Sequence, residues 1–419
     1  MDFRKLMEAG LPEDRLALVD MAARIASEEG VPLYLVGGAV RDLLLGRPTE
    51  DLDLVVEGDA ETLAAVIAKR MSGDVVSRSQ FATVKLKVRG SSLDMVTARN
   101  ESYARPGALP QIAHGTMRED LARRDFTINA MAYPLHLGSN ANLLDPHGGQ
   151  GDLRHGLVRV LHDGSFVDDA TRIMRAVRYE QRLGFALEER TESLLRRDLP
   201  MLDTISGDRL RRELLLWLQE ERRLKILARA DTLGVMAAIH PALAGAGASA
   251  WEAVGGGGHT SDAEVCLALL VRSLSRTDAE AIIERLRMLP GWAAVVRDTV
   301  DLRERLSELV GASESPSRLY ESLAPFDPAA VRGWSLAAPD AGVREALALY
   351  IDKLRHVKPL LSGRDLMQLG VPQGPAVGAM LVRLRTAKLE GAAEGRSQES
   401  DLVRDWLAEE GRISPGATD

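Results

Sequence analysis

Two aspartates in the apolar stretch TEDLDLVV are the first residues in this chain that suggest chemistry. Side chains alternate across a strand, so Asp51 and Asp53 would project from the same face of one, a few ångströms apart. Carboxylates held that close repel each other unless a cation lies between them. The pair therefore indicates a divalent-metal site or, taken alone, an ordinary solvent-exposed strand face.

The motif just before this strand predicts a phosphate site. In YLVGGAVRD, Gly37 and Gly38 lie between an expected strand and an expected helix, where backbone amides can approach a phosphate. Arg41 comes one turn into that helix, and its guanidinium fork could hold a further phosphate oxygen. A phosphate site beside a divalent-metal site predicts nucleoside triphosphate chemistry.

Two further stretches offer polar side chains to the same chemistry. In LARRDFTINAMAY, Arg124 could hold a triphosphate and Asp125 could contact a ribose hydroxyl, or Asp125 could cap a helix. In DMVTAR, Asp94 is either a third carboxylate that activates the attacking hydroxyl or an ordinary surface residue of a strand.

These residues belong to an expected α/β region that precedes a helical one. Residues 15–160 alternate helical patterns with β-like runs such as PLYLVGG, TVKLKVRG and SLDMVTAR. Beyond about residue 165 the strand patterns stop, and amphipathic helical patterns follow one another. The Gly- and Ala-rich segment 242–261 resembles a flexible loop and suggests a boundary.

Composition narrows the class of protein. With 419 residues the chain is too long for one compact core and suggests about two to four domains. No apolar run reaches the roughly 18 residues of a membrane span, and the N-terminus lacks a signal-peptide pattern. The single cysteine, Cys266, can form no internal disulfide, so a cytoplasmic protein without a membrane partner is expected. The net charge is −8, yet arginines cluster from REDLARRDF to RLRRELLLW, which suits a polyanion ligand held at one site.

Five motifs in order resemble those of a known family: GGAVRD, EDLDLV, RRDFTINAMA, DPHGGQGDL and DDATRIMRAVRYEQRLGF. They are similar to the class II tRNA nucleotidyltransferases, the CCA-adding enzymes and bacterial poly(A) polymerases of the polymerase-beta superfamily. The resemblance implies an α+β protein, in which a nucleotidyltransferase head with a small mixed β-sheet and helices precedes an all-α neck, body and tail. The implied domains are a catalytic head (1–150), a neck with a nucleotide-selecting helix (151–220), a body (221–355) and a tRNA-binding tail (356–419).

The motif DDATRIMRAVRY carries the expected nucleotide selection. Asp169 and Arg172 are three residues apart on an expected helix, so they form either an ordinary ion pair or a paired acceptor and donor. Cytosine and adenine place an amino donor beside a ring-nitrogen acceptor, whereas guanine and uracil would leave buried groups unpaired. The family's description of these positions as a template implies that Arg175 and Arg178 continue the same face toward the nucleotide. Asp168 departs from the family's usual Glu, and its shorter side chain would orient Arg172 less well.

The resemblance implies two-metal nucleotidyl transfer, with Mg²⁺ bound by the hard carboxylates of Asp51 and Asp53. Arg41 and Arg124 would neutralise phosphate charge. The expected substrates are tRNA, CTP and ATP, and the expected reaction is template-independent addition of C and A to the 3′ end of tRNA. An A-adding or CC-adding enzyme and a poly(A) polymerase share these motifs, and a non-catalytic RNA-binding relative is a further alternative. The loop that follows Arg99, NESYARPGALPQIAHGTMRED, favours full CCA or A addition, because the family associates its loss with CC addition.

Overall fold

The computed structural model describes residues 2–49, 52–78, 83–88, 90–102, 104–105, 107–108, 110–135, 142–255, 262–309 and 315–412. Asp51, one of the two predicted metal ligands, lies outside them. The chain forms two compact units, Met1–Pro241 and Ala242–Asp419. Their boundary falls at the start of the Gly- and Ala-rich segment, whereas the division into head, neck, body and tail stays a prediction.

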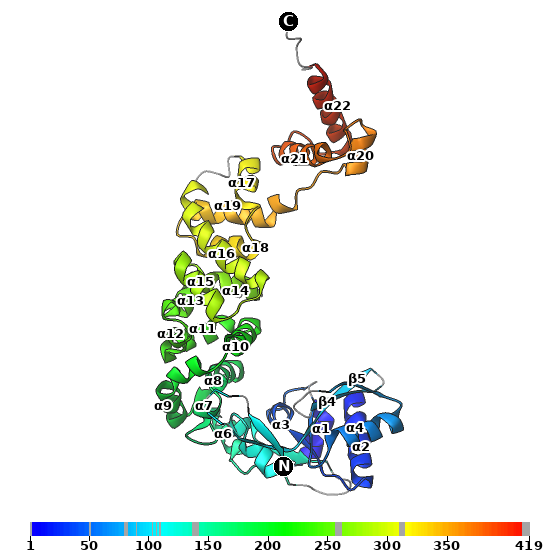
Figure 1. Cartoon of the computed structure of the whole chain (residues 1–419), viewed down its shortest axis with the longest axis vertical. Coiled ribbons are helices and arrows are strands. Elements are labelled where there is room, and N and C mark those ends of the chain that lie inside the picture. The colour runs from blue at the N-terminus through cyan, green and yellow to red at the C-terminus, as the bar shows by residue number, and fades with distance from the viewer. Residues whose placement is uncertain are drawn as a thin grey trace. The chain divides into compact units, whose positions relative to one another are not determined.

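A six-stranded mixed sheet forms the centre of the N-terminal head (Figure 1). The strand order is β3-β4-β5-β2-β1-β8. Strands β2 and β5 run parallel, and all other neighbours in this sheet are antiparallel. The predicted fold class, a small mixed sheet followed by helices, is therefore confirmed. The strands are β1 (Leu33–Val36), β2 (Asp53–Val56), β3 (Asp74–Arg78), β4 (Thr83–Val88), β5 (Ser91–Thr97) and β8 (Ala132–Pro134).

Alternation of apolar and polar residues decides which face of the sheet is buried. In β4, Val84, Leu86 and Val88 are buried, and the lysines between them are exposed. Helix α4 (Ala60–Met71) packs against β3, β4 and β5, and helix α2 (Glu13–Glu28) packs against α4, β1 and β5. The strands that carry Asp53 and Asp94 are thus held on a covered sheet.

A hairpin occupies part of the loop that the sequence predicts after Arg99. Strand β6 (Arg99–Ser102) pairs antiparallel with β7 (Gln111–His114), so the loop prediction is wrong for these residues. Their backbone groups hydrogen-bond to one another across this ladder, which gives the segment regular structure. Helix α5 (Met117–Ala122) follows and begins with a capping box whose N-cap residue is Thr116.

Helix α8 (Thr171–Leu183) carries most of the predicted nucleotide-selecting residues. Its apolar face packs against α10 (Gly207–Gln219) and α11 (Arg223–Leu233). The buried Trp217 indole on α10 donates a hydrogen bond to the backbone oxygen of Met174 at 2.9 Å. The other helices of this unit are α1 (Phe3–Gly10), α3 (Gly38–Leu44), α6 (Gly149–His155), α7 (Ser165–Asp168), α9 (Glu189–Arg197) and α12 (Val235–Ile239), with 3₁₀ helices η1 (Thr127–Asn129) and η2 (Leu199–Thr204).

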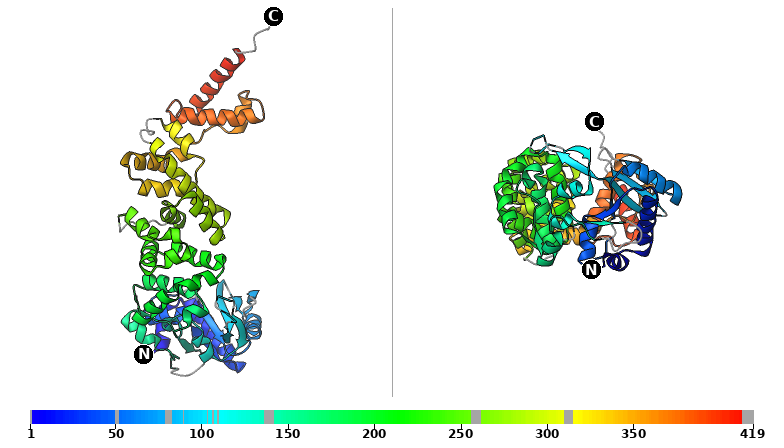
Figure 2. Two further views of the ribbon diagram at one scale, coloured as in Figure 1. Left: turned by 60° about the vertical axis from the view of Figure 1, so that its left-hand side comes forward. Right: turned by 90° about the horizontal axis from the view of Figure 1, so that it is seen from below.

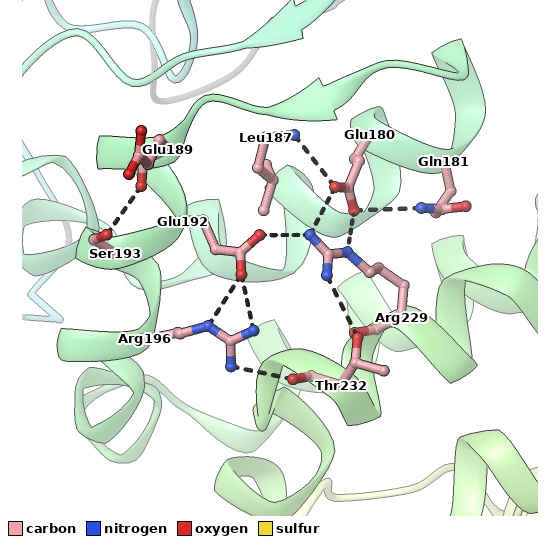
Figure 3. A network of polar contacts seen from close by, with 9 residues as sticks. All are labelled: Glu180, Gln181, Leu187, Glu189, Glu192, Ser193, Arg196, Arg229 and Thr232. Atoms are coloured by element: carbon pink, nitrogen blue, oxygen red, sulfur yellow. Dashed lines mark hydrogen bonds and ion pairs between the residues drawn. The ribbon is translucent and has the colours of Figure 1, made fainter.

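An ion-pair network ties the C-terminal half of α8 to α9 and α11 (Figure 3). The Glu180 carboxylate is buried and accepts from Arg229 Nε at 2.8 Å, from Arg229 Nη2 at 2.9 Å and from the Leu187 amide at 3.2 Å. Arg229 also donates to Glu192 at 2.6 Å, and Glu192 accepts from Arg196 at 2.8 Å. Two neighbouring helices therefore hold the C-terminal end of α8 in place. This fixes the position of the helix that carries Arg172 and Arg175.

Two predictions about the helical part are wrong in detail. Strands do not stop at residue 165, because β10 (Ala186–Leu187) pairs in parallel with β9 (Leu157–Val158). The segment 242–261 is not a loop throughout, because it contains α13 (Ala246–Ala253). Alanine is the strongest helix former, and four alanines outweigh the glycine in that stretch. Residues 256–261 lie outside the described residues.

The described residues of the second unit form helices and no strands. One apolar cluster runs from Leu302 to Leu354, and another joins Leu361, Leu366, Val371, Met380, Leu384 and Val403. Helices α21 and α22 pack against each other and are drawn in orange and red in Figure 2. Its helices are α13, α14 (Ala263–Val271), α15 (Arg276–Arg285), α16 (Pro290–Arg305), η4 (Leu306–Leu309), α17 (Pro316–Leu323), α18 (Pro328–Ala337), α19 (Ala341–Asp352), η6 (Leu354–His356), α20 (Gly363–Gln368), α21 (Pro375–Leu389) and α22 (Arg396–Arg412). No helix among the described residues has the length and apolar character of a membrane span.

Candidate active site

A cavity of about 600 Å³ in the first unit brings together most of the predicted site residues. Its walls come from the turn before α3, the start of β2, the segment after α5, and helices α8 and α10. Asp94 and Arg178 lie outside its lining, and Asp51 is not among the described residues. The predicted residues that line it are Gly38, Arg41, Asp53, Arg124, Asp125, Asp169, Arg172 and Arg175.

The turn between β1 and α3 requires glycine at its first position. Gly37 has a φ of +65°, in the left-handed region that glycine adopts without strain. A Cβ atom at Gly37 would lie 2.7 Å from Arg124 Nη1, so a side chain there would displace that guanidinium. The turn and Arg124 therefore form one wall, whereas their binding of phosphate stays a prediction.

Arg41 is buried in the cavity wall, with 3% of its surface exposed. Its Nε and Nη2 each donate to a carboxylate oxygen of Asp42 at 2.9 Å, and its Nη1 donates to Asn129 Oδ1 at 2.7 Å. Burial would lower the pKa of Arg41, but the bidentate pair with Asp42 raises the pKa above its ordinary value. The guanidinium is thus charged and held in one orientation.

Asp120 is a fully buried carboxylate that is not among the predicted site residues. Its Oδ2 accepts from Arg124 Nε at 3.2 Å and Nη2 at 2.9 Å, and its Oδ1 accepts from Arg123 Nε at 2.9 Å. Burial would raise the pKa of Asp120, but the two guanidiniums outweigh it and lower the pKa. The signal in the sequence is the spacing of Asp120 from arginines three and four residues later.

Asp125 holds other parts of the site together rather than capping a helix. Its Oδ1 accepts from the Phe126 amide at 2.8 Å and from Asn129 Nδ2 at 3.0 Å, and its Oδ2 accepts from Arg175 Nε at 2.9 Å and Nη2 at 2.6 Å. The following η1 has no side-chain cap, so the capping alternative is wrong. Burial would raise the pKa of Asp125, but Arg175 and Asn129 lower it below its ordinary value.

Asp53 and Asp94 are register partners on the parallel strands β2 and β5. Partners on neighbouring strands share a face. Asp53 is exposed, and the Asp94 side chain is 43% exposed, with its Oδ1 3.7 Å from Lys85 Nζ. Carboxylate oxygens are the ligands that Mg²⁺ prefers, so the chemistry of these donors fits that ion. Within the described part of the chain, no group of three or more His, Cys, Asp or Glu residues could hold a metal, and Asp51 is not included there.

Asp169 does not share a helix with Arg172, contrary to the prediction. Asp169 has extended backbone between α7 and α8, and its Oδ1 accepts from the amide of Thr171 at 2.9 Å and from its hydroxyl at 2.7 Å. Such a local side-chain turn competes with helical geometry. Oδ1 also pairs with Arg209 Nη2 on α10 at 2.7 Å, so Arg209 replaces the expected ion-pair partner. Among the described residues, Asp169 Oδ2 has no hydrogen-bond partner.

Backbone oxygens orient Arg172, and Asp168 does not. Arg172 is 5% exposed, and it donates from Nη2 to the Arg123 carbonyl at 2.6 Å and from Nη1 to the Ser165 carbonyl at 3.3 Å. The Asp168 Oδ2 instead lies 3.6 Å from His162 Nε2. Asp168 thus takes no part in the hydrogen bonds that hold Arg172, and the effect of an Asp in place of the family's Glu stays a prediction.

Three residues that are not among the predicted site residues complete the wall formed by α8 and α10: Tyr179, Arg209 and Glu213. Burial raises the pKa of Glu213, which nearby arginines offset only in part. Arg178 Nη2 lies 3.5 Å from Glu213 Oε2. Arg209 and Glu213 lie in RLRRELLLW, one end of the arginine cluster that indicates a polyanion ligand, but its amphipathic pattern does not single out either residue.

Comparison with known proteins agrees with this arrangement. Residues 33–159 match the family model described as Poly A polymerase head domain, and residues 184–246 match the one described as Probable RNA and SrmB- binding site of polymerase A. A solved structure of the Thermotoga maritima CCA-adding enzyme complexed with tRNA has a TM-score of 0.75 and 28% identity, covering 97% of this chain and 99% of that one. The matched head domain and the similarity to this solved structure thus define the class of protein as a nucleotidyltransferase.

Curated relatives narrow the class. The A-adding tRNA nucleotidyltransferase of Halalkalibacterium halodurans is 32% identical over 96% of this chain and 95% of that protein. The A-adding tRNA nucleotidyltransferase of Geobacter sulfurreducens is 33% identical over 95% of this chain, which spans 48% of that longer protein. CC-adding and CCA-adding enzymes are also among the relatives. The chain belongs to the tRNA nucleotidyltransferase family.

Proposed function

We propose that this protein adds AMP from ATP to the 3′ end of tRNA without a nucleic-acid template. The observation that carries the proposal is one cavity in which Arg41 and Arg124 lie near Asp53, with Asp169 and Arg172 at the same cavity wall. The arginines match a triphosphate, Asp53 matches a metal ion at the reacting centre, and Asp169 with Arg172 matches the edge of a base. Both relatives described above bear the name A-adding, which supports ATP as the substrate.

Preorganised cations are the main contribution of the chain to phosphate binding. Arg41 is held by Asp42 and Arg124 by Asp120, so neither guanidinium has to be ordered when the triphosphate binds. Asp53 and Asp51 would hold Mg²⁺, which when bound lowers the pKa of the attacking 3′-hydroxyl and stabilises the leaving pyrophosphate. Asp94, opposite Asp53 in register, is the further carboxylate proposed to orient that hydroxyl.

Asp125 is proposed to act through Arg175. Both Asp125 oxygens already accept two hydrogen bonds each, so contact with a ribose hydroxyl would have to displace or share one of them. Arg175, which this carboxylate holds in the cavity wall, is the group that would contact the nucleotide.

Base choice is proposed to rest on Asp169 and Arg172. Asp169 Oδ2 can accept from the exocyclic amino group, and Arg172 can donate to the neighbouring ring nitrogen. Uracil and guanine would place a carbonyl against the carboxylate and a ring N–H against the guanidinium. Each mismatch leaves a buried group unpaired, at about 1–3 kcal/mol.

Full CCA addition is the second candidate, and a specific observation favours it. Cytosine and adenine present the same edge pattern to Asp169 and Arg172, so this pair alone gives no reason to reject CTP. Arg99 and Glu101 of the β6–β7 hairpin also line the cavity, in the segment whose presence the family links to A or CCA addition.

Extension assays on three tRNA transcripts separate these activities. The transcripts end before the CCA, after CC, and after CCA, and each is incubated with CTP and ATP singly and together. A addition predicts that ATP extends only the CC-ended tRNA, whereas CCA addition predicts that the shortest transcript also gains all three nucleotides. Extension by C alone, or no extension of any transcript, would contradict the proposal.

A matched pair of variants tests the site in the same assay. Asp53→Asn should stop incorporation, and Asp74→Asn, which changes an exposed aspartate at the start of β3, should not. Equal loss in both variants would show that the effect does not come from the site.

A further inference from the structure

One aromatic ring lies among three arginines at the cavity. The guanidinium carbons of Arg41, Arg175 and Arg178 lie 5.3, 5.5 and 5.6 Å from the centroid of the Tyr179 ring. Tyr179 itself lines the cavity, on α8. Its hydroxyl also accepts a hydrogen bond from Arg175 Nη2 at 3.4 Å. Cation–π contacts act within about 6 Å of a ring centroid, so all three arginines are within reach.

The three guanidiniums would repel one another if nothing lay between them. Each already faces a carboxylate, on Asp42, Asp125 and Glu213 respectively. A carboxylate occupies the in-plane N–H donors, which are the groups that a phosphate must use. The face of an aromatic ring attracts the cation without using those donors. A guanidinium has five N–H donors, and the carboxylates use only some of them. The Tyr179 ring can therefore hold the arginines together without using the remaining donors, which stay available to an anion.

The ring is itself fixed in place. Phe126, which is fully buried, meets it edge to face, with centroids 5.7 Å apart and an interplanar angle of 76°. The next residue on α8, Glu180, is clamped by Arg229 in the network of Figure 3. Tyr179 thus joins the segment after α5 to a helix whose other side is anchored.

We propose that Tyr179 is a positioning residue for the triphosphate: its ring fixes the spacing and orientation of Arg41 and Arg175 in the cavity wall. The inference deepens the proposed function and rests on it for the identity of the ligand. Neither the GGAVRD motif nor the base-reading pair includes this residue, and its contribution is the shape of the cationic wall rather than a contact of its own with the nucleotide.

Binding of inorganic tripolyphosphate, measured by calorimetry in EDTA, tests the ring without metal or turnover. Tyr179→Phe keeps the ring and should leave the Kd within about threefold of the wild-type value. Tyr179→Leu removes the ring and should raise the Kd by about tenfold or more, because contacts with two cavity arginines are lost. Tyr179→Met, a flexible filler of the same space, should behave like Leu and replaces it if Leu does not fold. Tyr34→Leu removes a partly buried ring of β1 that lies outside the cavity lining, and it should leave the Kd unchanged.

Steady-state kinetics on tRNA supply the second readout. The KM for ATP should rise in parallel with the tripolyphosphate Kd in the ring-free variants, while the ratio of ATP to GTP use stays constant. An unchanged Kd in a folded ring-free variant, or a Phe variant as impaired as the Leu variant, would overturn the proposal. If the wild type extends no tRNA, the proposed function fails, yet the tripolyphosphate series still decides the role of the ring.

Discussion

Replacing Asp125 by Asn should destabilise the first unit more than any comparable loss of an exposed ion pair. Asp125 is 8% exposed and makes two hydrogen bonds to Arg175, at 2.6 and 2.9 Å. Asn keeps the size of the side chain and the acceptor for the Phe126 amide. It removes the charge, and its amide group would turn N–H donors toward the donors of Arg175.

The magnitude follows from the burial of the pair. Removing one partner of a fully buried ion pair costs about 3–5 kcal/mol, whereas exposed pairs contribute about 0–1 kcal/mol. The Arg175 side chain is 31% exposed and also lies 3.8 Å from Glu213, which offsets part of the loss. We therefore expect Asp125→Asn to lower the free energy of unfolding by about 2–3 kcal/mol at neutral pH.

The pH dependence of this difference has a definite sign. The pKa of Asp125 is lower in the folded protein than the unfolded value of about 3.9. Its contribution is therefore fully present above that unfolded value and is lost as the pH falls through the folded pKa. The difference between wild type and Asp125→Asn should be constant from about pH 5 to 8 and should shrink below about pH 4.

Urea unfolding, monitored by hydrogen exchange and mass spectrometry, reports on the stability of each unit separately. Peptides from 117–135 and 171–183 should lose protection at lower urea in Asp125→Asn, and peptides from 316–352 should not change. Asp163→Asn is the matched control, because Asp163 pairs with Arg190 at the surface through two hydrogen bonds. If both variants unfold at the urea concentration of the wild type, the Asp125 pair does not stabilise the site.

Four further outcomes are expected. Asp53→Ala should abolish incorporation of every nucleotide and leave tRNA affinity in filter binding nearly unchanged; normal turnover would remove the metal assignment. Asp169→Ala should narrow the difference in kcat/KM between ATP and the UTP and GTP controls by about tenfold, whereas constant ratios would place selection elsewhere. The tRNA affinity should fall steeply with salt, by a log–log slope of roughly −0.7 to −0.9 per neutralised phosphate, and a flat response would contradict a tRNA substrate. Glu399→Gln should weaken the tail locally by about 1–3 kcal/mol, since this buried carboxylate accepts from the Leu360 and Leu361 amides; hydrogen exchange of residues 360–412 measures it.

The sequence predicts the head well where the signal is local. Glycine is needed at Gly37 for a left-handed turn, and that turn places Arg41 on the first helix after β1. Strict alternation in TVKLKV identifies β4 and its buried face. Order and spacing of such motifs are enough to predict eight of the residues that line the cavity.

Errors arise where side chains compete with the backbone or where distant segments meet. Asp169 is expected on a helix, but its carboxylate bonds the Thr171 amide and hydroxyl and keeps its own backbone extended. The approach of α10 to α8 depends on packing around Trp217, so Arg209 and Glu213 reach the cavity from a helix that lies outside the five motifs.

The arginine–carboxylate pairs show which contacts can be predicted from sequence: pairs between neighbours in the chain can, and pairs between distant segments cannot. An isolated cluster of guanidiniums is unstable in a partly buried wall, so a sequence that predicts such a wall also predicts nearby carboxylates. The partner of Arg41 is its neighbour Asp42, which a local reading can find. Arg175 pairs with Asp125, fifty positions earlier, and this choice follows only when α8 packs against the segment after α5. The folding that brings each arginine to the cavity therefore also sets its orientation. Loss of one carboxylate should weaken nucleotide binding as well as lower the stability of the first unit.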